Sequence, residues 1–288
     1  MRIADILSDG KIHLSCEVFP PKKFDGLDEV KRVTTAIAAL RPAFISVTYG
    51  AAGTTPGLTL EVAEAVRAAQ VTPLCHITCV QSSREQVTRV LRSMHEAGLQ
   101  NVLALRGDLP KDGAPCGDFP HAEDLVRFIH TQGDFCVGGA CYPEGHPECP
   151  SRALDMEHLR RKVDAGLSFL TTQMFFDNGL LYNFFFRMER AGIHVPVCAG
   201  IMPICDARQV ARVVKLSGSI MPPRFAAIAD RFADKPEAMT QAGIAFATEQ
   251  IVDLVANGVN HIHLYTMNKP WIAEAIFRNL SGIIGMNT

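Results

Sequence analysis

Three adjacent residues, Arg106, Gly107 and Asp108, give the first chemical signal in this 288-residue chain. They end an apolar run from Asn101 that has the pattern of a strand buried on both faces, and Pro110 would prevent further pairing. Arginine offers a planar fork for phosphate or carboxylate, and glycine lets a ligand approach the backbone closely. The alternative is a simple Arg–Asp pair that caps the end of a strand.

Other predicted strands also end in polar residues, which favours a shared site over a simple Arg–Asp cap. These residues are Glu17, Thr48, Tyr49, His76, Thr78, Tyr142, Glu144, His146, Thr172, Gln173, His263 and Tyr265. A single buried Tyr or His is usually a hydrogen-bonded core residue. An acid, imidazoles, tyrosines and an amide that all end neighbouring strands point instead to a shared site.

Short β-rich runs alternate with amphipathic segments along the chain. The predicted strands are His13–Phe19, Ala43–Tyr49, Thr72–Cys79, Asn101–Arg106, Phe135–Tyr142, Phe169–Phe175, Val195–Ile201 and Asn260–Thr266. Helices are expected between them, and Gly98, Gly166 and Gly192 would close three of these. Eight such units in about 250 residues predict an α/β fold, a (β/α)8 TIM barrel in a single domain over 1–288.

Further helices are expected before the last strand, from Pro222–Pro223 and over Pro236–Asn257. A doubly wound sheet is the rival fold, but it would favour a Gly-rich turn after the first strand, where Pro20–Lys23 stands. In a barrel of this kind the active site lies at the carboxyl ends of the strands. The polar residues above are predicted to line that mouth.

Composition narrows the possible partners. The net charge is −2 with no Lys/Arg run, which predicts neither nucleic acid nor a membrane surface as a partner. No apolar run reaches the roughly 20 residues of a membrane span, and Asp5 and Asp9 interrupt any signal peptide. Nine cysteines without a C-x-x-C pair predict a reduced, cytoplasmic protein without disulfides.

Metal chemistry is one alternative. The segment Cys141–Cys149, the pair Cys75 and His76 with Cys79, and His261 with His263 could supply ligands for zinc-dependent methyl transfer on a barrel. No pair has the usual spacing of structural zinc sites, so no metal is predicted.

The helix after Cys149 carries Asp155, His158, Arg161 and Lys162 at separations of three and four residues. These side chains could share one helical face. Such a face suits a pyrophosphate and ribose, and it equally suits an ordinary solvated surface.

Several blocks together resemble the 5,10-methylenetetrahydrofolate reductase family. They are Ser15–Pro21, Ser46–Gly50, Ala104–Pro110, Tyr142–Pro147, Arg161–Gly166 and Thr172–Asp177, and they occur in the family's order. The likeness extends through Leu264–Asn268. The chain is similar to the short bacterial form, which has the catalytic barrel without the regulatory domain of eukaryotic enzymes.

The resemblance implies an FAD-dependent oxidoreductase of one-carbon metabolism that serves methionine biosynthesis. NADH or NADPH would reduce the flavin and leave, and methylenetetrahydrofolate would then accept the hydride, in a ping-pong sequence. Family members are often oligomers, so a homo-oligomer is expected. The two remaining alternatives are a metal-dependent methyltransferase and a folate- or flavin-binding subunit that needs a partner.

The resemblance also implies residue roles. Glu17 would be the general acid, and Asp108 would be catalytic. Cofactor contacts would come from Thr48, Tyr49, Ala51, His76, Arg106, Gly107, Asp108, Ala122, Tyr142, His146, Asp155, His158, Arg161 and Lys162. Substrate contacts would come from Glu17, Asp108, Gln173, Gln209 and Lys269. His158 replaces a common Asn, and Lys269 replaces a common Arg.

Overall fold

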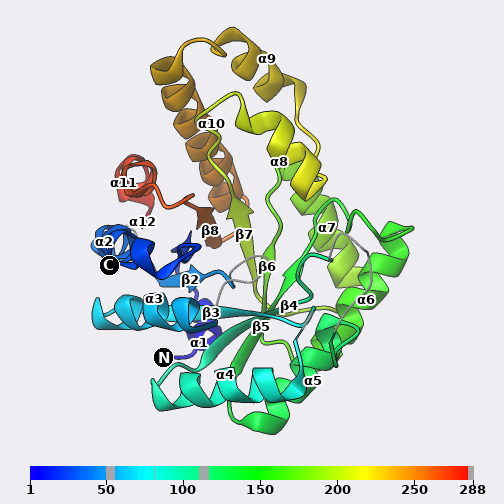
Figure 1. Cartoon of the computed structure of the whole chain (residues 1–288). Coiled ribbons are helices and arrows are strands. Elements are labelled where there is room, and N and C mark those ends of the chain that lie inside the picture. The colour runs from blue at the N-terminus through cyan, green and yellow to red at the C-terminus, as the bar shows by residue number, and fades with distance from the viewer. Residues whose placement is uncertain (50–55, 81, 110–116, 285–288) are drawn as a thin grey trace.

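A computed structural model describes residues 1–49, 56–80, 82–109 and 117–284. Eight parallel strands form a closed barrel in which each strand pairs with the next and β8 pairs with β1 (Figure 1). The strands are β1 (His13–Val18), β2 (Phe44–Val47), β3 (Thr72–Thr78), β4 (Asn101–Leu105), β5 (Cys136–Cys141), β6 (Phe169–Thr172), β7 (Val197–Ile201) and β8 (His261–Tyr265). The predicted (β/α)8 TIM barrel is confirmed.

Helices lie around the strands (Figure 1). They are α1 (Ile3–Leu7), α2 (Leu27–Ala38), α3 (Pro56–Ala68), α4 (Arg84–Glu96), α5 (Ala122–Gln132), α6 (Arg152–Asp164), α7 (Asn178–Arg190), α8 (Gln209–Ser217), α9 (Pro223–Arg231), α10 (Pro236–Ala256), α11 (Pro270–Asn279) and α12 (Ser281–Ile284), with a 3₁₀ turn η1 at Phe24–Gly26. Within the described residues, no helix is both long and apolar enough to cross a membrane.

The two further helices expected before the last strand are present as α9 and α10, which extend with α8 from one side of the barrel (Figure 1). They have a small core of their own that includes Phe176, Phe225 and Met239. The rings of Phe225 and Phe246 meet edge to face with centroids 4.7 Å apart. These helices therefore pack over the segments that follow β6 and β7.

The interior of the barrel is apolar at the amino ends of the strands. Phe44, Leu74, Leu103 and Phe169 pack there against α1, which closes this end. Gly138 makes room for Phe169, because a Cβ at that glycine would lie 2.3 Å from the ring. The short helix α1 is not predicted from the sequence.

The direction in which side chains point follows from strand alternation. On β1, Leu14, Cys16 and Val18 face the helices and belong to the main core, whereas Ser15 and Glu17 contact groups inside the barrel. β6 ends at Thr172, earlier than expected, although the Gln173 amide still bonds to the Cys141 carbonyl of β5. The carboxyl ends of the strands thus bring the polar residues to one mouth.

Candidate active site

Glu17 lies at the carboxyl end of β1 with 19% of its side chain exposed. The sheet register places it beside Ser46 on β2 and Tyr265 on β8. Its Oε2 atom is 3.8 Å from the Nε2 atoms of both His76 and His263. The carboxyl group is therefore surrounded on several sides by hydrogen-bonding groups while it keeps an opening to solvent.

His263 connects two serines inside the barrel and is only 1% exposed. Its Nδ1 lies 2.8 Å from Ser15 Oγ, and Ser15 donates its own proton to the Ile262 carbonyl at 3.1 Å. At this contact Nδ1 donates to Ser15 or accepts from it according to the tautomer of the imidazole. Ser46 Oγ lies 3.2 Å from His263 Nε2 and 3.5 Å from Glu17 Oε2, so its single proton can bond to either.

His76 on β3 is 5% exposed, and its Nε2 has no hydrogen-bond partner among the described residues. Burial lowers its pKa to about 4, against a smaller opposing effect of Glu17. The imidazole is therefore neutral at neutral pH. A buried, unpartnered ring nitrogen at the mouth of a barrel is suited to a bound ligand.

Arg106 follows β4, and its guanidinium pairs with Glu148 in a bidentate contact of 2.5 and 2.9 Å. Its Nε donates to the Gly107 carbonyl at 3.3 Å. The partner that the structure gives Arg106 is therefore Glu148, not the neighbouring Asp108. Hydrogen bonding to Glu148 raises the pKa of Arg106 and lowers that of the glutamate.

Gly107 has φ +84°, a left-handed conformation that favours glycine. A Cβ there would lie 3.0 Å from Thr78 Cβ, so any larger residue would crowd the end of β3. Asp108 is exposed, and its charge contributes to the raised pKa of Tyr142, which burial lifts to about 12. Arg106, Asp108 and Tyr142 thus lie close together at the ends of β4 and β5.

Helix α6 begins at a serine cap, because Ser151 accepts from the Leu154 amide. Asp155 accepts from the His146 amide at 3.3 Å, which holds the loop after β5. Lys162 Nζ donates to the Ala140 carbonyl at 2.6 Å, and burial lowers its pKa. The first turn of α6 therefore contacts the loop after β5, and the last turn contacts β5 itself.

The neighbouring basic residue on α6 points elsewhere. Arg161 is exposed, and its Nε lies 3.6 Å from Glu123 on α5, next to Ala122. His158 is half-buried on the same helix. The predicted single face is thus divided between the barrel and α5, and the cofactor roles of these residues stay predictions.

The remaining predicted residues follow other strands. Thr48 and Tyr49 follow β2, Gln173 follows β6, Gln209 begins α8, and Lys269 follows β8. Ala51 lies outside the described residues. The predicted positions therefore come from loops around the same end of the barrel.

Ser46 was not among the predicted site residues, and His263 was considered only as one of the polar strand ends and as a possible zinc ligand. Both face the barrel interior beside Glu17. The available signal was a small polar residue at an inward position of the strand next to β1.

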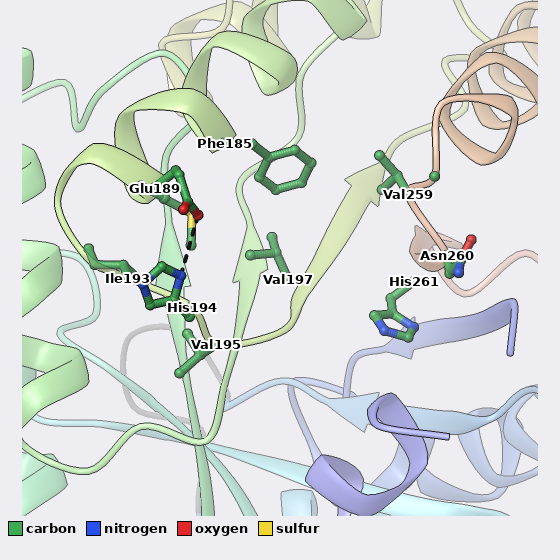
Figure 2. A pocket seen from close by; sticks show the side chains of 11 residues that line it. Phe185, Glu189, Ile193, His194, Val195, Val197, Val259, Asn260 and His261 are labelled. Atoms are coloured by element: carbon green, nitrogen blue, oxygen red, sulfur yellow. Dashed lines mark ion pairs between the residues drawn. The ribbon is translucent and has the colours of Figure 1, made fainter. Parts of the chain in front are cut away.

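Two findings concern other kinds of site. Across the ranges given above, the structure has no group of three His, Cys, Asp or Glu side chains arranged to hold a metal ion. A cavity of about 390 Å³ lies between α7 and the amino ends of β7 and β8, where Glu189 pairs with His194 at 3.3 Å (Figure 2). None of the predicted site residues lines it.

The fold and the mouth define the class: a (β/α)8 barrel protein with an acid and imidazoles at the carboxyl ends of its strands. The family model described as methylenetetrahydrofolate reductase matches residues 2–281. The chain belongs to this family.

Individual relatives agree. The 5,10-methylenetetrahydrofolate reductase of Pectobacterium carotovorum is 32% identical, with 94% of this chain and 91% of the relative covered. That of Escherichia coli is 31% identical with the same coverage. Methylenetetrahydrofolate reductase (NADH) 1 of Arabidopsis thaliana is 34% identical, but the chain spans only 50% of its length.

A solved structure shares the fold. It is an uncharacterized protein from Clostridium thermocellum that binds two copies of 5-methyl-5,6,7,8-tetrahydrofolic acid. It matches with a TM-score of 0.71 at 12% identity, over 99% of this chain and 100% of that one. At this identity the likeness concerns the fold alone.

Proposed function

We propose that the protein reduces 5,10-methylenetetrahydrofolate to 5-methyltetrahydrofolate with FAD as cofactor and NADH or NADPH as reductant. The two substrates would use the site in turn, in a ping-pong sequence. Membership in the reductase family supports the folate substrate. The observation that carries the proposal is Glu17, a partly exposed acid among buried imidazoles at the mouth of the barrel.

The donors around the mouth fit FAD, which would supply the hydride acceptor and donor when bound. Its anionic diphosphate suits Arg106 and Lys162, whose donors are partly unused, and Gly107 permits close approach of the backbone. The unpartnered His76 Nε2 offers a further polar contact. The proposed FAD residues are Thr48, Tyr49, Ala51, His76, Arg106, Gly107, Asp108, Ala122, Tyr142, His146, Asp155, His158, Arg161 and Lys162.

Glu17 would supply the proton that the folate chemistry needs. Opening the five-membered ring of the substrate requires protonation of the departing nitrogen, which leaves an iminium carbon able to accept a hydride. Ser46 Oγ is placed to hydrogen-bond the carboxyl group, and His263 in turn holds Ser46 and Ser15. These contacts would fix the orientation of the Glu17 carboxyl group through its Oε2 atom.

The proposed substrate contacts besides Glu17 are Asp108, Gln173, Gln209 and Lys269. Asp108 is exposed beside Tyr142, where a negative charge would favour hydride donation to the folate. The Gln173 Oε1 atom accepts from the Met174 amide at 3.0 Å, which fixes the orientation of the side-chain amide. We also propose a cytoplasmic homo-oligomer in which each chain is one FAD-binding domain.

Anaerobic titration of purified protein tests this function. The preparation should be yellow, NADH or NADPH should bleach it without any added partner, and methylenetetrahydrofolate should restore the colour. A colourless protein with stoichiometric zinc would instead favour the methyltransferase alternative. Bleaching that requires a second protein would favour the subunit alternative.

A further inference from the structure

The turn after β5 contains a glutamate that the proposed function leaves without a role. The Gly145 amide donates to the Tyr142 carbonyl at 3.0 Å, and Glu144 lies within the turn that this bond closes. Arg152, at the start of α6, donates from its Nε atom to the Glu144 carbonyl at 3.2 Å. The backbone of the turn is therefore fixed by its own bonds, and the Glu144 side chain is available for a contact outside the loop.

The Glu144 carboxyl group reaches the connection between α8 and α9. Its Oε2 atom accepts from the Ile220 amide at 2.9 Å, although the two residues are 76 positions apart in the sequence. The Oε1 atom is buried without a hydrogen-bond partner among the described residues, and burial raises the pKa of the group. Burial of a carboxyl group costs free energy. The contact that the side chain makes in return fixes the chain at Ile220.

Two further contacts fix the same connection to the barrel. Ser219 Oγ donates to the Met174 carbonyl at 2.7 Å, in the segment after β6. Gly218 has φ +69°, and a Cβ at this position would lie 2.8 Å from the Pro147 ring. The connection therefore packs directly on the loop after β5. We call residues 218–220 with their contacts to the barrel loops the clasp.

The clasp holds the carboxyl end of α8. Ser217 is the last residue of this helix, and its Oγ donates to the Val213 carbonyl at 2.8 Å and accepts from the Ser219 amide at 3.1 Å. Gln209, a proposed folate contact, is the first residue of the same helix. The two ends are separated by about 12 Å along the helix axis. Because a helix of this length moves as a rod, its position at the clasp determines where Gln209 lies.

We propose that Glu144 is a positioning residue for the folate substrate, which holds the clasp and thereby keeps Gln209 at the mouth of the barrel. This inference rests on the proposed function. A displacement of about 1 Å in a group that contacts a ligand is enough to lose most of its contribution. The backbone of the turn after β5 keeps its own hydrogen bonds without the Glu144 side chain, so the proposed FAD contacts should stay in place.

Hydrogen exchange of the purified protein without added substrate tests the clasp. In Glu144→Ala the Ile220 amide loses its acceptor, so the segment 217–222 should exchange at least about 10-fold faster than in the wild type. Glu144→Gln keeps a side-chain carbonyl as acceptor and should exchange nearly as slowly as the wild type. The amides of α10 should not change in either variant. Unchanged exchange of 217–222 in Glu144→Ala would overturn the clasp, whatever the protein binds.

Calorimetry with 5-methyltetrahydrofolate, the proposed product, tests the role toward folate. Glu144→Ala should weaken binding about 10-fold, the factor that corresponds to one hydrogen bond to a charged acceptor, and Glu144→Gln should bind within about 3-fold of the wild type. Ser219→Ala removes the contact with Met174 on the other side of the clasp and should weaken binding about 3-fold. The affinity for FAD should change less than about 2-fold in all three variants.

Glu157→Ala is the matched control. Glu157 is exposed on α6, so this variant also removes one carboxylate near the loop after β5 but leaves the contacts of the clasp intact. Its affinity for 5-methyltetrahydrofolate and its exchange over 217–222 should equal those of the wild type. The control separates the contact of Glu144 with Ile220 from the general effect of losing a negative charge.

The remaining outcomes distinguish this inference from the proposed function. Faster exchange in Glu144→Ala with unchanged folate affinity would overturn the link between the clasp and Gln209. Equal losses of folate and FAD affinity in Glu144→Ala, with neither loss in Ser219→Ala, would assign the effect to the FAD loop and overturn the inference as well. If the wild-type protein binds no folate while the clasp exchanges as predicted, the proposed function fails, and the role of Glu144 toward folate fails with it.

Discussion

The two ends of the barrel interior are built by the same strands but from opposite kinds of residue. At the amino ends, Phe44 and Phe169 fill the barrel and α1 closes it. Two residues further along, Ser46 on β2 and Thr171 on β6 are polar, and Ser46 lies beside Glu17 and His263. Because alternate residues face inward, one strand can supply packing at one end and chemistry at the other.

The largest loss of stability should come from a substitution that removes side-chain packing at the amino ends of the strands. Phe169 is fully buried against Gly138, so Phe169→Ala should lower the free energy of unfolding by about 3–5 kcal/mol. Chemical denaturation measures this, with the exposed Phe186→Ala as control at less than about 0.5 kcal/mol. A loss of under about 1 kcal/mol would show that the apolar end is not the main source of stability.

The second prediction concerns how burial of His76 at the polar end lowers the free energy of unfolding in acid. His76 is buried with a pKa lowered to about 4, whereas the unfolded chain has an ordinary value near 6.5. Between these values the unfolded state binds more protons, so stability falls as pH decreases from about 6.5 to about 4. The total loss should be about 3 kcal/mol, and none of it should occur above about pH 7.

Denaturation curves at several pH values would measure this loss. His76→Gln removes the titrating group and should flatten the curve in this range, although it also changes a packed site. His194, which is exposed at the opposite end, provides the control, and His194→Gln should leave the slope unchanged. A wild-type slope that survives in His76→Gln would assign the pH dependence to other groups.

The comparison of the two ends also shows what could be predicted from sequence. The eight strands, their order and the closing glycines at Gly98, Gly166 and Gly192 were predicted, because apolar runs and turn residues are local signals. Helix α1 was missed, since five residues give too little periodicity. The bidentate pair of Arg106 and Glu148 could not be foreseen, because it joins two loops that are 42 residues apart.

The third prediction separates chemistry from packing. Glu17→Gln keeps the size of the side chain and its hydrogen-bonding capacity, but it cannot donate the proton for ring opening. The half-reaction with methylenetetrahydrofolate should slow by about 100-fold, and flavin reduction by NAD(P)H should remain near normal. Rapid mixing of each half-reaction measures both rates. Equal slowing of the two would assign Glu17 to flavin binding or structure instead.

The smallest expected effect distinguishes Arg161 from Lys162, two adjacent basic residues of α6. Arg161 is exposed and forms an ion pair with Glu123, whereas Lys162 donates to the Ala140 carbonyl at the end of β5. Arg161→Ala should therefore weaken FAD binding only about 3-fold, within the range for an exposed charge, and added FAD should restore thermal stability by mass action. Lys162→Met should weaken FAD binding more strongly. Equilibrium dialysis measures FAD affinity, and thermal melts with added FAD measure the recovery of stability. An equal loss of FAD affinity in the two variants would mean that both side chains contact the cofactor to the same degree.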